Sequence, residues 1–184
     1  MDARDLGSRI LITVGGIAML AGAIDPLEGS LAILPGSGLV ALGAILGRRE
    51  RRVITFRLLV LILIALGAGA MFGLSVIGGF GGSSGRSDWW GLLVLPYPIG
   101  WSMGIWGPGA PRWMLWSGIG VSLWQLTMLA TVVGEQVTQP AVTRPIFGSP
   151  MIVLACIGLL TIFGCVRALR KRTSSGSGPS SAAP

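Results

Sequence analysis

Two neighbouring apolar segments contain the side chains that could form a binding site. They are Pro96, Tyr97, Pro98, Trp101 and Gln125. Because proline has no backbone N–H, the two prolines leave the carbonyls of Leu92 and Val94 without helical donors. Such groups need partners in hydrocarbon, and a helix broken at the membrane midplane is a good indicator of a binding site. We expect the Gln125 amide to donate to these carbonyls. Trp101 and Trp124 would flank the contact as an aromatic wall for a lipid or another apolar ligand. The alternative is an ordinary kink packed inside a helix bundle.

Residues for catalysis or metal binding are scarce. The chain has no histidine, which removes the commonest metal ligand and the commonest general base near neutral pH. Cys156 and Cys165 lie nine residues apart, so on a helix they face opposite sides and cannot form a disulfide. Asp25 and Glu28 suit the turn before a helix better than acid–base chemistry, since the positive end of a helix stabilises a carboxylate. We therefore predict no catalytic residue, metal or cofactor, and the sequence favours a non-enzymatic protein.

The elements that hold these residues are apolar runs of membrane-spanning length. The 184 residues are 52% hydrophobic and only 11% charged, whereas a soluble domain has about 25% charged residues. A helix needs about 20 residues to cross the hydrocarbon core. The sequence therefore predicts an all-α polytopic transmembrane helix bundle, residues 1–172, and a disordered Ser/Gly/Pro/Ala tail, residues 173–184. The six predicted spans are Ile10–Ile24, Leu31–Leu46, Leu58–Ile77, Trp89–Trp106, Trp113–Val133 and Met151–Val166.

Positive charge predicts how the spans are oriented. The basic residues form two clusters, one after the second span and one at the end of the sixth. Because basic loops stay on the cytoplasmic side, an even number of spans separates the clusters, and both termini are cytoplasmic. The net charge of +7 does not form the basic face that phosphate contacts require, so we expect no nucleic-acid partner. The clusters are Arg48, Arg49, Arg51, Arg52 and Arg57, and Arg167, Arg170, Lys171 and Arg172.

Two alternatives change this topology. The apolar run Ile10–Leu20 and the small residues Ala21-Gly22-Ala23 fit a signal peptide and its cleavage site. Cleavage would leave five spans and the remaining orientation unchanged, although Asp2 and Asp5 dilute the positive charge that a signal peptide needs. If Trp89–Trp106 were a re-entrant segment, the basic tail would lie outside. The even number of spans between the basic clusters favours the six-span topology.

Small residues indicate which helix faces pack together. Gly118, Ser122 and Gln125 share one face at spacings of four and three, and a small, polar seam of this kind packs against helices rather than lipid. Pairs of glycines four residues apart also allow close helix contact. These pairs are Gly43/Gly47, Gly69/Gly73 and Gly100/Gly104.

The patterns together predict a multi-pass integral membrane protein that is a non-enzymatic scaffold or subunit. Its partners would be membrane lipids and, through the small-residue faces, other membrane proteins or a second copy of the chain. The compact loops are typical of a bacterial inner membrane. The alternative is a small transporter or lipid-binding membrane protein with its site at the broken fourth span. Because no Asp, Glu or His lies in mid-membrane, proton-coupled transport would have no proton carrier.

Overall fold

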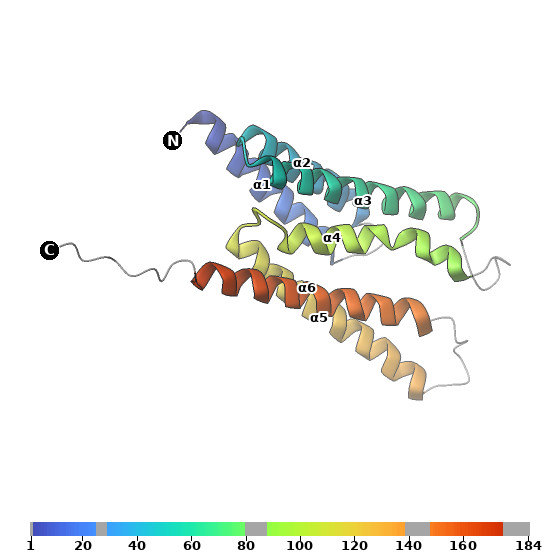
Figure 1. Cartoon of the computed structure of the whole chain (residues 1–184). Helices are drawn as coiled ribbons and strands as arrows, with labels where there is room; N and C mark the ends of the chain where they lie inside the picture. Colours follow the sequence, from blue (N-terminus) through green and yellow to red (C-terminus); the bar gives the residue numbers. More distant parts are fainter. Residues whose placement is uncertain (1, 25–28, 80–87, 139–147, 175–184) are drawn as a thin grey trace.

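The described part of the chain folds into six α-helices and a short 3₁₀ helix, as a computed structural model shows (Figure 1). The structure describes residues 2–24, 29–79, 88–138 and 148–174, and no strand occurs in these ranges. The protein is therefore all-helical in its described part, as predicted. The helices are α1 (Ala3–Gly22), α2 (Ser30–Leu46), α3 (Arg51–Val76), the 3₁₀ helix η2 (Asp88–Val94), α4 (Pro96–Trp106), α5 (Arg112–Thr138) and α6 (Gly148–Ser174).

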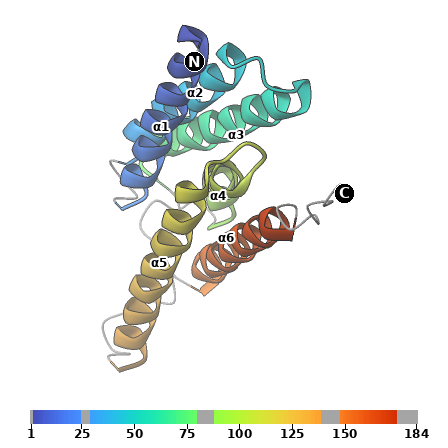
Figure 2. The same cartoon turned by 90° about the vertical axis from the view of Figure 1, so that its left-hand side faces the viewer.

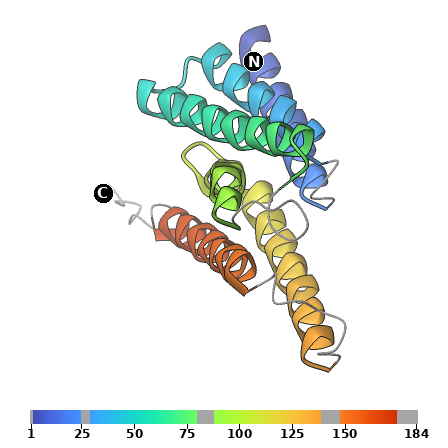
Figure 3. The same ribbon diagram turned by 90° about the vertical axis from the view of Figure 1, so that its right-hand side faces the viewer.

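Successive α-helices run in opposite directions through the bundle. α4 lies between two groups, α1 to α3 on one side and α5 with α6 on the other (Figures 2 and 3). α1 begins and α6 ends at the same end of the bundle, where short turns also join α2 to α3 and α4 to α5 (Figure 1). We call this end, with its turns at residues 47–50 and 107–111, the basic end. Both predicted basic clusters lie there.

Within the described ranges, three helices are long and apolar enough to cross a membrane. They are α1, α3 and the Ile152–Ser174 part of α6. α3 has 26 residues, which corresponds to about 39 Å of helix, and α2 is a shorter apolar helix of 17 residues. Large apolar side chains face outward, and Val76 is 86% exposed. The described helices are thus compatible with membrane association.

Small residues bring α1 and α2 into close contact. A Cβ on Gly36 would lie 2.8 Å from the backbone oxygen of Gly15, and one on Gly43 would lie 2.8 Å from Ile12. The Ser8 hydroxyl donates a hydrogen bond of 2.7 Å to the Gly43 carbonyl oxygen. Close backbone approach of this kind is a common way for apolar helices to associate, because it increases dispersion contact.

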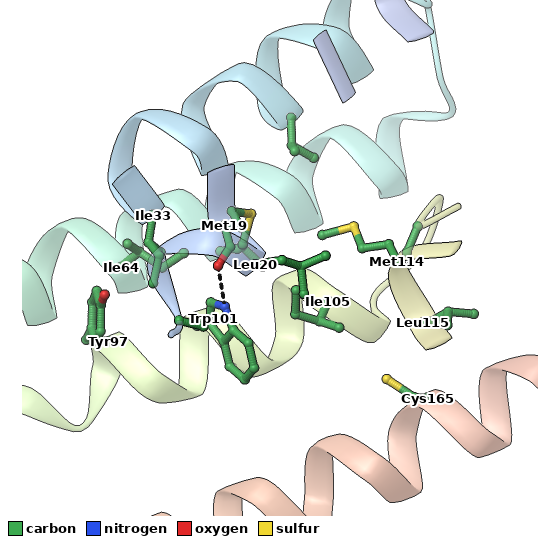
Figure 4. Packing of buried hydrophobic residues seen from close by; sticks show 14 of the residues in the cluster. Met19, Leu20, Ile33, Ile64, Tyr97, Trp101, Ile105, Met114, Leu115 and Cys165 are labelled. Carbon is green, nitrogen blue, oxygen red and sulfur yellow. Dashed lines mark hydrogen bonds between the residues drawn. The ribbon is translucent and has the colours of Figure 1, made fainter. Parts of the chain in front are cut away.

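The core surrounds α4. Met19 of α1, Ile64 of α3 and Ile105 of α4 are completely buried, and Met114 of α5 and Cys165 of α6 are buried beside them (Figure 4). The pair Gly100/Gly104 allows this contact, since a Cβ on Gly100 would lie 2.9 Å from Ile64 and one on Gly104 would lie 2.6 Å from Met19. The first helix is therefore an integral part of the core.

The predicted break in the fourth span lies where the 3₁₀ helix η2 ends at Val94 and α4 begins at Pro96. Pro96 lies in the first turn of α4 rather than inside a longer helix, and the α-helix itself has only 11 residues. Proline is favoured in that first turn because the missing N–H has no helical partner to lose. The Leu95 N–H donates to the Leu92 carbonyl at 3.1 Å, so one of the two carbonyls that were expected to need a distant donor is paired locally.

Several predicted features fall at or beyond the edge of the described residues. α6 continues to Ser174, so Thr173 and Ser174 are helical rather than part of a disordered tail. The rest of the predicted tail lies outside the described residues. The same holds for the turn residues Asp25 and Glu28.

Candidate functional site

A cavity of about 630 Å³ lies where the end of α1 meets α4, α5 and α6. Four of the five predicted site residues line it: Tyr97, Pro98, Trp101 and Gln125. Pro96, the fifth, is not among its lining residues. The structure thus brings together a segment of α4 and a residue of α5 that are far apart along the chain.

Trp101 forms one wall of the cavity and closes the end of α1. Its side chain is only 4% exposed, and its indole Nε1 donates a hydrogen bond of 2.9 Å to the Met19 carbonyl oxygen (Figure 4). That carbonyl belongs to the last turn of α1, where helical donors run out. The Ala23 N–H, its ordinary partner, donates to Leu20 instead. Trp101 therefore packs between α1 and α4 and lines the cavity.

Gln125 also caps α1, which differs from its predicted role. Its Nε2 donates to the Ala23 carbonyl oxygen at 3.2 Å, and it was expected to donate to Leu92 and Val94. The need for a donor arises at the C-terminal end of α1, because Pro96 begins α4 without breaking it. The face that carries Gln125 is the predicted seam, with Ser122 completely buried and Gly118 in contact with Ile105.

Tyr97 carries a buried hydroxyl beside the cavity. The residue is 9% exposed, and within the described residues its hydroxyl has no hydrogen-bond partner. Its backbone lies directly on Gly67 of α3, because a Cβ at that glycine would come within 2.7 Å of the Tyr97 Cα. A buried tyrosine hydroxyl usually finds a hydrogen-bond partner. Because that of Tyr97 has none among the described residues, packing against Gly67 holds the side chain in place.

Trp124, which was expected to flank the Gln125 contact together with Trp101, also lines the cavity. The sequence did not indicate other parts of the wall. Met71 of α3, Met128 of α5 and Leu154, Ile157 and Gly158 of α6 also line it. Methionine is flexible and polarisable, which suits an adaptable apolar surface. Apolar residues are common in every span, so their type alone does not mark these five as cavity residues.

Polar side chains also tie α4 to α6. The Trp106 Nε1 donates to the Ser102 hydroxyl at 3.2 Å, and the Ser102 and Thr161 hydroxyls are 2.6 Å apart. The Thr161 hydroxyl donates to the Ile157 carbonyl oxygen at 2.7 Å. Since Thr161 donates its proton there, Ser102 is the donor to Thr161. In this series of hydrogen bonds each hydroxyl both accepts and donates. A complete series of this kind stabilises polar groups that are buried between apolar helices.

Arg57 is the most important residue that sequence reasoning placed wrongly. It was assigned to a basic loop cluster, but it is only 3% exposed and lies inside α3. Its guanidinium donates to the carbonyl oxygens of Gly104 at 2.6 Å and Pro108 at 2.9 Å. Proline at position 108 supplies no N–H to the Gly104 carbonyl. Two separate signals in the sequence point to this contact. Gly104 is followed four residues later by Pro108, which leaves its carbonyl without a helical donor, and Arg57 lies directly before the apolar run of α3.

The fold and the cavity together define a class: the described part of the chain is all-helical, with three apolar helices long enough to span a membrane and a mainly apolar pocket between its helices. No known protein family, curated protein or solved structure matches the chain. Within the described residues, no group of three or more His, Cys, Asp or Glu side chains lies close enough together to hold a metal ion.

Proposed function

We propose that this chain is a polytopic, non-enzymatic membrane protein that binds a lipid-like apolar molecule from the bilayer in the cavity beside Trp101. The observation that carries the proposal is a cavity of about 630 Å³, within the range of about 300–1,000 Å³ that is usual for small-molecule sites. Its lining is apolar except for Tyr97, Trp101 and Gln125. The Trp101 indole N–H donates to the Met19 carbonyl oxygen and the Gln125 amide donates to that of Ala23, both at the end of α1.

The composition of the wall argues for an apolar ligand and for binding rather than reaction. Among the described residues that line the cavity, none is charged, so a charged substrate would be desolvated there without compensation. Catalysis by proton transfer needs a side chain that can gain or lose a proton near neutral pH, and the described lining offers only the Tyr97 phenol. A lipid tail loses nothing on entering such a site, because it leaves one apolar environment for another.

Photolabelling tests the proposed ligand. The probe is a palmitate analogue that carries a diazirine in mid-chain, added to protein in an uncharged detergent. We expect labelled peptides from α5 residues 124–129. Leu154 lines the cavity and is 50% exposed, so Leu154→Trp should fill space without creating a void and should lower labelling about ten-fold, a loss of about 1.4 kcal/mol in binding.

The matched control is Leu159→Trp. Leu159 lies on the same helix and is 59% exposed, and it is not among the cavity's lining residues. This variant should be labelled like the parent protein. Labelling that is spread evenly over all exposed helix faces, or that falls equally in both variants, would contradict a ligand site in the cavity.

We also propose six spans with both termini in the cytoplasm of a bacterial inner membrane. The clusters at the basic end support a common side for the two termini, since Arg57 and Arg172 both contact the turn after α4. η2 and α4 together cover about 30 Å when they continue in one direction, which equals the thickness of the hydrocarbon core. The core position of Met19 supports retention of α1 rather than its removal as a signal peptide.

Reporter fusions test this topology. A reporter joined after residue 184 should be active only in the cytoplasm, and one that replaces the chain after Gly85 should be active only outside. The reason is the even number of spans between the basic clusters. A C-terminal reporter outside the membrane would refute the six-span topology and favour a re-entrant η2–α4 segment.

A role as scaffold or subunit is the second candidate. It is favoured by the pair Gly69/Gly73 on α3, where a Cβ at either position would meet nothing within 4 Å. The other two predicted glycine pairs are filled from inside the molecule. Glycine on an open helix face permits close approach of another helix, so this is where a partner span would pack.

A further inference from the structure

A second groove runs between α4 and α6 toward the basic end. Its volume is about 830 Å³. Its walls are apolar, with Ile99, Met103 and Trp106 from α4 and Leu160 and Phe163 from α6. The hydrogen-bonded Trp106–Ser102–Thr161 chain holds the two helices together along its floor. The groove is therefore a defined feature of the α4–α6 contact.

The groove changes character at the basic end, where its lining is positively charged. Arg167, Lys171 and Arg172 line it there. Arg167 and Lys171 are exposed and, at a spacing of four, lie on one face of α6. Arg172 donates to the Ala110 carbonyl oxygen at 2.6 Å, which fixes the end of α6 against the turn after α4. None of the residues that line this groove in the described part of the chain is acidic.

Arg167 and Lys171 both line the groove. An anion between them would accept charge-assisted hydrogen bonds from both side chains. The apolar wall begins at Phe163, one turn before Arg167 in α6. The site thus offers two cations for a head group and an apolar channel for the chain attached to it.

We propose that this groove binds an anionic phospholipid, with the phosphate between Arg167 and Lys171 and an acyl chain along Phe163 and Trp106. Along α6 the lining extends from Ile157 to Arg172, about 22 Å of helix. This length covers the head-group level and one leaflet of a hydrocarbon core about 30 Å thick. Basic pockets between membrane helices on the cytoplasmic side are suited to anionic head groups. The inference rests on the proposed membrane location but is independent of the ligand proposed for the first cavity.

Lipid titration in an uncharged detergent tests the inference. The probes are dioleoyl phosphatidylglycerol and dioleoyl phosphatidylcholine, and retained lipid is measured by native mass spectrometry together with the shift in thermal unfolding. We expect phosphatidylglycerol to bind about ten-fold more tightly than phosphatidylcholine. The double variant Arg167→Gln with Lys171→Gln should abolish this preference. Arg172 is left unchanged because it holds the turn at Ala110.

Three controls separate the groove from general surface charge. Arg170→Gln with Arg52→Gln removes the same charge from exposed residues that do not line the groove, and it should keep the preference. Leu154→Trp, which fills the first cavity, should keep it as well. Phe163→Gln should weaken phosphatidylglycerol binding through the apolar wall.

The inference would be overturned by any of three results. These are equal binding of the two lipids, an equal loss of preference in the Arg170→Gln/Arg52→Gln control, and full competition by inorganic phosphate, which would indicate a free-anion site. Failure of Leu154→Trp to alter palmitate photolabelling would count against the proposed function alone. The two proposals can therefore fail separately.

Discussion

Gly67→Ala is expected to destabilise the contact between α3 and α4 by about 2 kcal/mol. A Cβ at this position would lie 2.5 Å from the Tyr97 Cβ and 2.7 Å from the Tyr97 Cα, and neither atom can rotate away. Overpacking typically costs about 1–3 kcal/mol, and a contact with backbone lies at the upper end. The gain of about 1 kcal/mol in helix propensity offsets only part of this cost. Unfolding in mixed micelles with increasing sodium dodecyl sulfate measures the change.

Gly69→Ala is the matched control on the same helix. A Cβ there would meet nothing within 4 Å, so only the helix-propensity term remains, and stability should rise by about 0.5–1 kcal/mol. The two substitutions therefore have opposite signs at positions two residues apart. Equal effects at both positions would mean that α3 does not present Gly67 to α4.

Arg57→Leu is expected to lower the free energy of unfolding by about 2–3 kcal/mol. The change removes the donors of the Gly104 and Pro108 carbonyls. The Gly104 carbonyl is buried, and a buried group without a partner costs about 1–3 kcal/mol, whereas the carbonyl of the exposed Pro108 can bind water. Part of this loss is offset because the variant no longer buries a charge. The same micelle titration measures the effect.

Arg52→Leu is the control for Arg57→Leu. Arg52 lies one turn earlier on α3 and is exposed, so the identical substitution should change stability by less than about 0.5 kcal/mol. A protein in which Arg57→Leu behaved like Arg52→Leu would not use Arg57 to hold the turn after α4.

The positions of the helices could be predicted because each one is an apolar run long enough to show in the sequence. Apolar character places a residue in a span without saying which other span it contacts. Trp101 illustrates this: the sequence places it in the fourth span, but its partner Met19 lies 82 residues away. No local period relates two residues that meet only when separate helices pack.

The errors share one cause, which is the ambiguous meaning of proline and arginine in apolar runs. Pro96 was interpreted as a break inside a helix, whereas it begins one, and the role of Gln125 was therefore assigned to the wrong carbonyls. Arg57 was counted as a loop residue because charge in an apolar run usually marks its end. Its actual partners are the carbonyls of Gly104 and Pro108. Because Pro108 has no N–H to offer Gly104, the need for a donor arises on another helix.

The capping of α1 by later helices has a consequence for biosynthesis. The carbonyls of Met19 and Ala23 receive their donors from Trp101 and Gln125, which a ribosome adds some 80 to 100 residues later. While only α1 and α2 have emerged, the last turn of α1 must fray or recruit water or head groups. The α1–α2 pair is therefore not fully stabilised at this stage. Nascent chains arrested before residue 101 should show faster amide exchange at the last turn of α1 than the complete protein. The C-terminal end of α1, although synthesised first, thus reaches its final structure only after α4 and α5 have been added.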